Sequence, residues 1–523
     1  MAVLLGPAEG TPPGSAAVDD GVRSATRAEL DGRVNRWIGL LRGLGLRTGD
    51  AAAVVAGNRV ETVEVLLACL HSGVTAVPVN WHLTPAEVAY QLADSGAALV
   101  VADVARAPLA AAALALVEGD RPPALVFGAE PVDGLRPAEP VLAAQPDAEP
   151  ADQVCGALML YTSGTTGRPK GVINTLFVTG TGFERVERLL AYSGSALGVP
   201  ADGVVLLVGP WYHSAQLFFS VLPLLRGSRL VMRDRFDAAE TLALLGRERV
   251  TECHLVPTQF VRLLRLPEAE RAAFDGSSLR RVWHGGGPCP VDVKRGMIDW
   301  WGRCLVEYYA ATEAGVVTMI TADEWLERPG SVGRAVPPTE VLILDDDGEP
   351  LPAGQPGRVF LRRPSRRNFR YHNAPEKTAA AHLGPGVFTY GELGHVDADG
   401  FLYLSGRRQD LILSGGVNVY PAEVEAVLLE HPAVHDVAVV GVPDDEYGER
   451  VLAVVEPAAT DPPADPDDLA RTLDAHCRGR LAGFKVPRLY RLVPELPREP
   501  TGKLRRQALQ ETYRDLAASG GRR

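Results

Sequence analysis

Short apolar runs alternate with helical patterns along the first part of the chain, and this alternation strongly limits the possible folds. Apolar residues recur at steps of three and four from Ala28 to Leu44, which predicts a helix. Residues 51–56 and 74–79 are short apolar runs typical of buried strands. A second helix is predicted from Asn58, and Thr84 followed by Pro85 predicts the start of a third. This order predicts a parallel α/β sheet.

The remaining sequence predicts one large domain and one small domain. Residues 118–153 are rich in proline, alanine and acidic residues, and we interpret them as a surface connection. Strand–helix alternation continues through residues 204–283, whereas the sequence after Gly330 is hairpin-rich and predicts a β-rich subdomain. We place the boundary between a large N-terminal α/β domain, residues 1–406, and a small mobile C-terminal α/β domain, residues 407–523.

The composition argues against a general affinity for nucleic acid or for an anionic membrane. The chain has 523 residues and a formal net charge of -12, so any anionic ligand must be attracted by local positive charge. The six cysteines form no C-x-x-C pair, which is typical of core residues in a reducing compartment. No basic leader precedes an apolar segment, and no apolar run is long enough to span a bilayer. We therefore expect a cytoplasmic monomer or homodimer.

One stretch, Tyr161–Gly171, has the composition of a phosphate-binding loop. Its glycines allow backbone N–H groups to turn toward an anion, and its serine and threonine hydroxyls can donate hydrogen bonds. Lys170 adds a positive charge, but it follows proline and precedes Gly171, so the P-loop pattern is absent. The stretch predicts a hydroxyl-rich loop over a polyphosphate.

Thr162–Lys170 resembles the nucleotide loop of the acyl-adenylate-forming superfamily, which includes acyl- and aryl-CoA ligases. Other segments resemble further motifs of that superfamily in the same order along nearly the whole chain: Tyr309–Glu313, Glu392–Gly394, Gly406–Asp410, Gly415–Glu425 and Pro497–Lys503. The segments 254–259 and 288–294 look most like the bacterial fatty-acyl/aryl-CoA ligase branch.

The resemblance implies a site for ATP and Mg²⁺. The phosphates of ATP would be held by Thr162, Ser163, Gly164, Thr165, Thr166, Gly167 and Lys170. Adenine would lie against Gly285, Gly286 and Gly287 and stack on Tyr309, while Glu392 and Arg407 would bind the ribose. Thr312 would contact the α-phosphate, Glu313 would bind Mg²⁺, and Lys503 would reach the α-phosphate and the substrate carboxylate.

The reaction implied by the resemblance has two steps. A carboxylate attacks the α-phosphorus of ATP and pyrophosphate leaves; a thiol, usually coenzyme A, then displaces AMP. Between the steps the small domain swings, which withdraws Lys503 and brings Gly415 and Gly416 to a thiol tunnel. Two positions depart from the common pattern: Glu392 replaces the usual aspartate, and the uncharged Gln409 occupies the hinge position.

The resemblance also places an acyl pocket behind His213, which would gate it. The predicted pocket residues are Trp211, His213, Gln216, Gln259, His284 and Val316. Aromatic residues with scattered amides suit an aryl or functionalised acid about as well as a fatty chain.

Two other functions remain open from the sequence. Some enzymes of this superfamily use ATP to activate nitrite and diazotise an aromatic amine, and the departures at Glu392 and Gln409 leave room for such chemistry. A non-catalytic nucleotide-binding protein is the second alternative, although the intact Glu313 and Lys503 argue against it.

Overall fold

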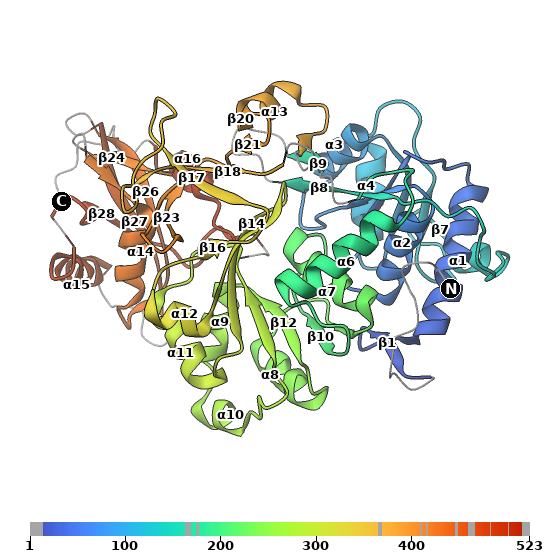
Figure 1. Ribbon diagram of the computed structural model, residues 1–523, viewed down its shortest axis with the longest axis horizontal. Coiled ribbons are helices and arrows are strands. Elements are labelled where there is room, and N and C mark those ends of the chain that lie inside the picture. The colour runs from blue at the N-terminus through green and yellow to red at the C-terminus, as the bar shows by residue number, and fades with distance from the viewer. Residues whose placement is uncertain are drawn as a thin grey trace.

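The computed structural model describes residues 14–162, 169–173, 177–364, 369–407, 410–414, 417–444, 448–458, 466–481, 483–499 and 502–514. Their strands form three sheets, and the C-terminal sheet lies at one end of the molecule (Figure 1). Among these residues, no helix combines the length and the apolar character that crossing a membrane requires.

The first sheet has eight strands in the order β19-β9-β8-β4-β3-β5-β6-β7 and is mostly parallel. In chain order its strands are β3 (Ala51–Val55), β4 (Thr75–Pro78), β5 (Ala97–Ala102), β6 (Ala124–Val126), β7 (Arg136–Pro137), β8 (Ala157–Thr162), β9 (Lys170–Ile173) and β19 (Arg370–Tyr371). The helices around it are α1 (Arg27–Gly43), α2 (Val60–His71), α3 (Pro85–Ser95), α4 (Ala107–Ala115) and α5 (Glu139–Ala143).

Both faces of this sheet are covered, as the uninterrupted apolar run of β3 requires. Ala52 and Val54 pack in the cluster that contains α1 and α2, whereas Ala53 and Val55 pack against α3 and α4. Alternate side chains of a strand point to opposite faces, so all five residues of β3 are buried. Thr84 caps α3 through a capping box with Glu87, as the sequence predicts for its N-cap.

The second sheet has 15 strands and changes from parallel to antiparallel along its length. Its parallel part contains β1 (Ala16–Asp19), β10 (Val204–Leu207), β11 (Arg229–Met232), β12 (Glu252–Leu255), β13 (Arg281–His284) and β14 (Leu305–Ala311), with β2 (Ser24–Thr26) antiparallel at the edge. The helices between these strands are α6 (Glu184–Leu197), α7 (Ser214–Arg226), α8 (Ala238–Arg247), α9 (Pro257–Leu264), α10 (Glu268–Ala273) and α11 (Val291–Trp301).

The antiparallel part of the second sheet includes the β-rich subdomain expected after Gly330, but it begins earlier, at Gly315. It contains β15 (Gly315–Thr321), β16 (Gly333–Ala335), β17 (Glu340–Leu344), β18 (Gly357–Arg362), β20 (His382–Gly384), β21 (Val387–Phe388), β22 (Glu392–Val396) and β23 (Phe401–Arg407), with the helices α12 (Ala322–Glu327) and α13 (Pro375–Ala381). β15 pairs antiparallel with β14 and so connects this part to the parallel strands.

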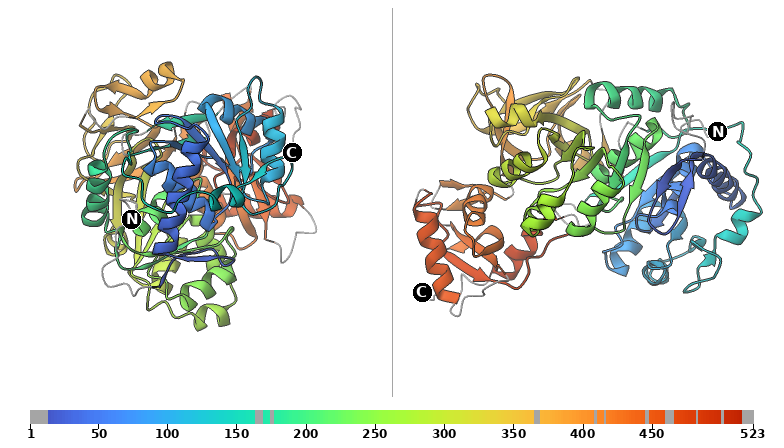
Figure 2. Two further views of the ribbon diagram at one scale, coloured as in Figure 1. Left: turned by 90° about the vertical axis from the view of Figure 1, so that its right-hand side faces the viewer. Right: turned by 90° about the horizontal axis from the view of Figure 1, so that it is seen from below.

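The third sheet belongs to the small C-terminal domain, at one end of the elongated molecule (Figure 2). It contains β24 (Ile412–Ser414), β25 (Val417–Val419), β26 (Val434–Asp444), β27 (Gly448–Pro457) and β28 (Leu489–Leu492), together with α14 (Pro421–Leu429), α15 (Pro466–Arg478) and α16 (Arg506–Thr512). The boundary predicted between residues 406 and 407 falls one residue before the end of β23, which belongs to the large sheet.

The structure corrects the interpretation of residues 118–153 as a surface connection. This segment contains β6 and β7, which extend the first sheet, and α5, whose Leu142 is buried. The apolar run of β6 is only three residues long, too short to stand out among the surrounding prolines and acidic residues.

Candidate active site

The triple glycine and the aromatic motif lie side by side because they follow two neighbouring parallel strands. β13 and β14 pair in parallel with His284 opposite Glu307, so Gly285 comes next to Tyr308. A Cβ atom at Gly285 would lie 2.7 Å from the carbonyl oxygen of Tyr308, so only glycine fits this approach. Gly286 has a φ of +80°, and a Cβ at Gly287 would meet no atom within 4 Å. Gly287 therefore leaves open space for a ligand after β13.

Tyr309 and Glu392, both predicted to hold the nucleoside, are joined directly. The hydroxyl of Tyr309 donates to Glu392 Oε2 at 2.9 Å, and Glu392 is 8% exposed. Glu392 on β22 pairs with Arg407 on β23, so the backbone places both predicted ribose residues at one point of the sheet. The carboxylate of Glu392 is thus oriented by Tyr309, although its side chain is one methylene longer than aspartate.

The predicted metal ligand and phosphate lysine meet at one tyrosine. Tyr371 donates to Glu313 Oε1 at 2.9 Å, and Lys170 Nζ lies 4.9 Å from the centre of the Tyr371 ring. β19 pairs with β9, which brings Tyr371 to this position. Burial lowers the pKa of Lys170, and the charge of Lys377 lowers it as well, whereas Glu313 opposes both.

A cavity of about 360 Å³ opens beside Lys170. Its lining includes Lys170, Lys377, His372, Asn373 and Asp94. Thr162 and Lys170 pair with each other at the ends of the antiparallel strands β8 and β9. Ser163, Gly164, Thr165, Thr166 and Gly167 lie outside the described residues.

Glu313 suits a magnesium ion that is shared with a nucleotide. Mg²⁺ in such sites is usually held by one or two carboxylates together with substrate phosphates, not by an all-protein cage. The described parts of the chain contain no group of three or more acidic, histidine or cysteine residues arranged around a metal. One oriented carboxylate beside a lysine-lined cavity therefore fits this kind of site.

The predicted gate residue lies at the start of α7, next to the α-phosphate residue. His213 is the N-cap residue of α7, and the hydroxyls of Ser214 and Thr312 form a hydrogen bond of 3.1 Å. Burial lowers the pKa of His213 to about 3, and the charge of Lys503 contributes in the same direction. The imidazole is therefore neutral at neutral pH, and Lys503 lies close enough for its charge to act on His213.

The chain beside Lys503 docks on the large domain. A Cβ at Gly502 would lie 2.5 Å from Thr258 Oγ1, and Gly502 has a φ of +80°. Thr258 is in the first turn of α9, next to Gln259, whose Oε1 accepts from the backbone N–H of Val256 at 2.9 Å. The structure therefore brings Lys503, His213 and Thr312, which are far apart in sequence, to one region.

An aromatic cluster lies below the predicted gate. Phe219 of α7 stacks on Trp283 at 4.7 Å between ring centres and on His254 at 5.4 Å. His254 Nε2 is 2.6 Å from the hydroxyl of Tyr308, and burial lowers the pKa of His254 to about 3. Val316 is partly buried against the same cluster.

Several buried polar atoms around this cluster have no hydrogen-bond partner among the described residues. They are Gln216 Oε1, His213 Nε2, His254 Nδ1 and both ring nitrogens of His284. Buried polar atoms are almost always paired, so such atoms are expected to bind a ligand or a water molecule. Gln216 lies on α7, His213 is the N-cap residue of that helix, and His254 stacks on Phe219 in the aromatic cluster. His284 follows Trp283 on β13, so it points to the opposite face of the sheet, where it packs against Phe260.

Trp211 does not join the other predicted pocket residues. Its Nε1 donates to the carbonyl of Ala56 at 2.7 Å, and its backbone N–H donates to Asn58 Oδ1 at 3.1 Å. The side chain packs in the core cluster of the first sheet, because its single donor is satisfied there. His284 is wholly buried beside the ion pair of Lys294 and Glu307, whose atoms are 2.5 Å apart.

The hinge prediction cannot be followed in the structure. Gln409, Gly415 and Gly416 lie outside the described residues. Conversely, Tyr371, His254 and Tyr308 were not predicted as site residues, although His254 begins a segment that carries the resemblance. Their roles depend on neighbours far away in the sequence.

Comparison with known proteins decides the family. The model described as AMP-binding enzyme matches residues 7–368, and the model described as AMP-binding enzyme C-terminal domain matches residues 423–503. The chain belongs to the AMP-binding enzyme family. A feruloyl-CoA synthase of Amycolatopsis is 36% identical over 506 residues, 94% of each chain. The long-chain-fatty-acid–CoA ligase FadD13 of Mycobacterium tuberculosis is 33% identical over 494 residues, 93% of each chain.

Solved structures of this AMP-binding enzyme family share its fold. The structure of an anthranilate CoA ligase, AuaEII, in complex with anthranoyl-AMP matches with a TM-score of 0.86 and 25% identity. The match covers 99% of this chain and 98% of that one, so the two-domain α/β fold is common to both proteins.

Proposed function

We propose that the protein is an acid–CoA ligase that activates an aromatic carboxylic acid with ATP and transfers the acyl group to coenzyme A. The observation that carries this proposal is that Gly502, the neighbour of Lys503, packs against Thr258 of the large domain, so that the charge of Lys503 acts on His213. Lys503 acts electrostatically on His213, and Thr312 is bonded to Ser214 in the same turn. A cation and a hydroxyl at the mouth of an aromatic cluster suit the attack of a carboxylate on a phosphate ester.

The first step joins the acid to AMP. A carboxylate oxygen forms a bond to the α-phosphorus, and the bond from that phosphorus to the bridging oxygen of pyrophosphate breaks. Both reactants are anionic, so the residues must offset charge and align the atoms. Lys503 would neutralise the carboxylate and the α-phosphate, and Thr312 would hold an α-phosphate oxygen.

The cavity beside Lys170 supports a place for the leaving pyrophosphate. Lys377 lines the same cavity, and its charge lowers the pKa of Lys170, whereas the charge of Glu313 raises it. An anionic phosphate that enters the cavity would offset the repulsion that Lys377 exerts on protonated Lys170. Magnesium, when bound at Glu313, would offset the negative charge of the β- and γ-phosphates.

The second step moves the acyl group to a thiol. The sulfur of coenzyme A bonds to the acyl carbon, the bond to the phosphate oxygen breaks, and AMP leaves while the thiol proton passes to solvent. The curated relatives support this acceptor, since both are named as CoA synthases or ligases.

The residues that we expect to contact the acyl group favour an aromatic acid that carries a polar substituent. Phe219 and Trp283 offer flat apolar faces, whereas Gln216 and His254 offer buried polar atoms without partners among the described residues. A fatty chain would leave those atoms unpaired, which costs about 1–3 kcal/mol for each group. A hydroxyl or amino group on the ring would pair with them.

A pyrophosphate-release screen tests the proposal. Purified protein, ATP and Mg²⁺ are combined with hydroxy- and amino-substituted benzoic and cinnamic acids or with fatty acids, each with and without coenzyme A. We expect release with the substituted aromatic acids and formation of the thioester only when coenzyme A is present. Release that requires nitrite and an arylamine, and no carboxylic acid, would instead identify a diazotase.

A further inference from the structure

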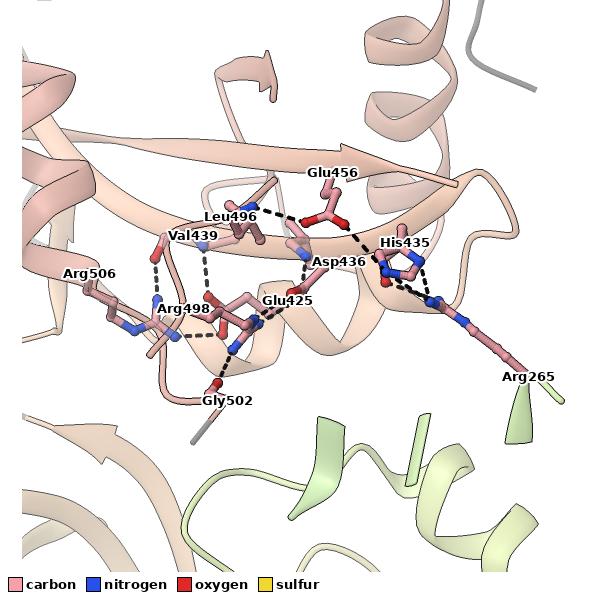
Figure 3. Close-up of polar contacts among 11 residues, drawn as sticks. Arg265, Glu425, His435, Asp436, Val439, Glu456, Leu496, Arg498, Gly502 and Arg506 are labelled. Atoms are coloured by element: carbon pink, nitrogen blue, oxygen red, sulfur yellow. Dashed lines mark hydrogen bonds and ion pairs between the residues drawn. The ribbon is translucent and has the colours of Figure 1, made fainter. Parts of the chain in front are cut away.

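Helix α9 contacts the small domain at both of its ends. At its first turn, Thr258 packs against Gly502, the neighbour of Lys503. At its C-cap, Arg265 reaches across to His435, the second residue of strand β26 in the small domain (Figure 3). Its Nη2 donates to the carbonyl oxygen of His435 at 3.0 Å, and its Nη1 donates to His435 Nδ1.

His435, which Arg265 contacts, is followed by a residue that holds the chain around Lys503. Asp436, next to His435, accepts two hydrogen bonds from one edge of the Arg498 guanidinium: Nε donates to Oδ2, and Nη2 donates to Oδ1 at 2.7 Å. Arg498 Nη1 then donates to the carbonyl oxygen of Gly502 at 2.7 Å. The backbone of Arg498 also pairs with Leu504 in an antiparallel bridge, so Arg498 contacts the residues on both sides of Lys503.

A second contact from His435 reaches the other end of this segment. Glu456 Oε1 lies 3.4 Å from His435 Nε2, and Glu456 Oε2 accepts from the backbone N–H of Leu496 at 3.0 Å. Figure 3 shows two series of polar contacts: one joins His435 through Glu456 to Leu496, and the other joins Asp436 through Arg498 to Gly502. The chain that carries Lys503 is therefore anchored to the residues that Arg265 holds.

The charges at this contact are complementary. Burial lowers the pKa of Arg265, while the carboxylates of Asp436 and Glu456 oppose that shift. Two carboxylates of the small domain thus face one cation of the large domain. Hydrogen bonds to a charged group are stronger than neutral ones, so this contact can bias the orientation of a mobile domain.

We propose that Arg265 is a positioning residue for Lys503. Its contact with His435 holds the small domain in the orientation that presents Lys503 to His213 and Thr312, so the adenylation step depends on Arg265. This proposal rests on the proposed function. The thioester step requires Lys503 to withdraw, so it does not need the contact. Replacement of Arg265 should therefore slow adenylation and leave thioester formation unchanged.

The test measures the two half-reactions separately in Arg265→Ala. Acid-dependent exchange of pyrophosphate into ATP reports adenylation, and conversion of a chemically prepared acyl-adenylate with coenzyme A reports thioester formation. We expect exchange to fall about ten-fold, the loss of one charged hydrogen-bonded contact, while thioester formation stays within two-fold of wild type. Arg265→Lys keeps a donor for the His435 carbonyl and should recover part of the exchange.

Arg262→Ala is the matched control, because Arg262 is an exposed arginine on the same helix. It should leave both half-reactions unchanged. Arg498→Ala is the second variant and should also lower exchange, because Gly502 loses its partner within the small domain. The retained thioester step shows that each variant is folded.

The outcomes distinguish this proposal from the proposed function. If wild type shows no acid-dependent exchange, the proposed function fails. If wild type is active and Lys503→Ala is not, but Arg265→Ala exchanges normally, the positioning role of Arg265 is refuted. An equal fall of both half-reactions in Arg265→Ala would also refute it, because a general structural contact would have that effect.

Discussion

An alanine at Gly287 would add a methyl group to the space that we assign to adenine. In the protein alone this methyl meets no atom within 4 Å, and the φ of Gly287 is not in the left-handed region. The stability of Gly287→Ala should therefore stay within about 0.5 kcal/mol of wild type. With a nucleotide bound, the methyl would separate the base from the backbone and from Tyr309. A lost base–aromatic stack costs about 1–3 kcal/mol, so the Kd for AMP should rise about 5- to 150-fold.

Gly285→Ala should behave in the opposite way. Its Cβ would lie 2.7 Å from the Tyr308 carbonyl oxygen and 2.9 Å from a carbon of the Tyr308 ring. Such overpacking costs about 1–3 kcal/mol of stability even without a ligand. Gly246→Ala on α8, where a Cβ also meets nothing within 4 Å, is the control for adding a methyl group far from the site.

Calorimetric titration with AMP and thermal unfolding measure the two effects on the same samples. The reasoning predicts weak AMP binding with normal stability for Gly287→Ala, and lower stability for Gly285→Ala. Wild-type affinity for AMP in Gly287→Ala would refute the placement of adenine against this glycine.

Three further changes test the surroundings of the site. Lys294→Ala should lower the free energy of unfolding by about 3–5 kcal/mol in a denaturant titration, because it leaves Glu307 charged and unpaired in the core; a fall below 1 kcal/mol would contradict this. Tyr309→Phe should raise the KM for ATP several-fold with little change in stability. It removes the hydrogen bond that orients the Glu392 carboxylate, which contributes about 1 kcal/mol. An unchanged KM would argue against a ribose role for Glu392. Burial lowers the pKa of His254 from 6.5 to about 3, so the unfolded chain binds the proton first and stability falls as the pH drops below about 6.5. From pH 7 to pH 5 this costs about 2 kcal/mol, which His254→Gln should remove in thermal unfolding at the two pH values; an equal loss in both proteins would contradict the assignment.

The sequence predicts those parts of the fold that depend on local patterns. The cap at Thr84 and the helix predicted from Ala28 to Leu44 depend on neighbours within a few residues, and the structure confirms both. The strands β6 and β7 were missed, because their apolar content is too small to signal a strand without the sheet beside them.

The site was less predictable where tertiary contacts decide a residue's role. Tyr371 becomes important because β19 pairs with β9, about 200 residues earlier in the sequence. Trp211 is two residues before His213, yet its indole N–H donates to the carbonyl of Ala56, and the ring packs in the core cluster of the first sheet. No periodicity in the sequence reports either contact.

The most direct test of the account is exchange of pyrophosphate into ATP by wild type and by Lys503→Ala. We propose that adenylation takes place near His213 and Thr312, where the charge of Lys503 acts on His213 and Thr312 is hydrogen-bonded to Ser214. Removing one preorganised charge at such a site typically costs about 10²–10³ in rate. We expect Lys503→Ala to lose acid-dependent exchange by at least that factor while it binds AMP as wild type does. Exchange at the wild-type rate in Lys503→Ala would contradict the account.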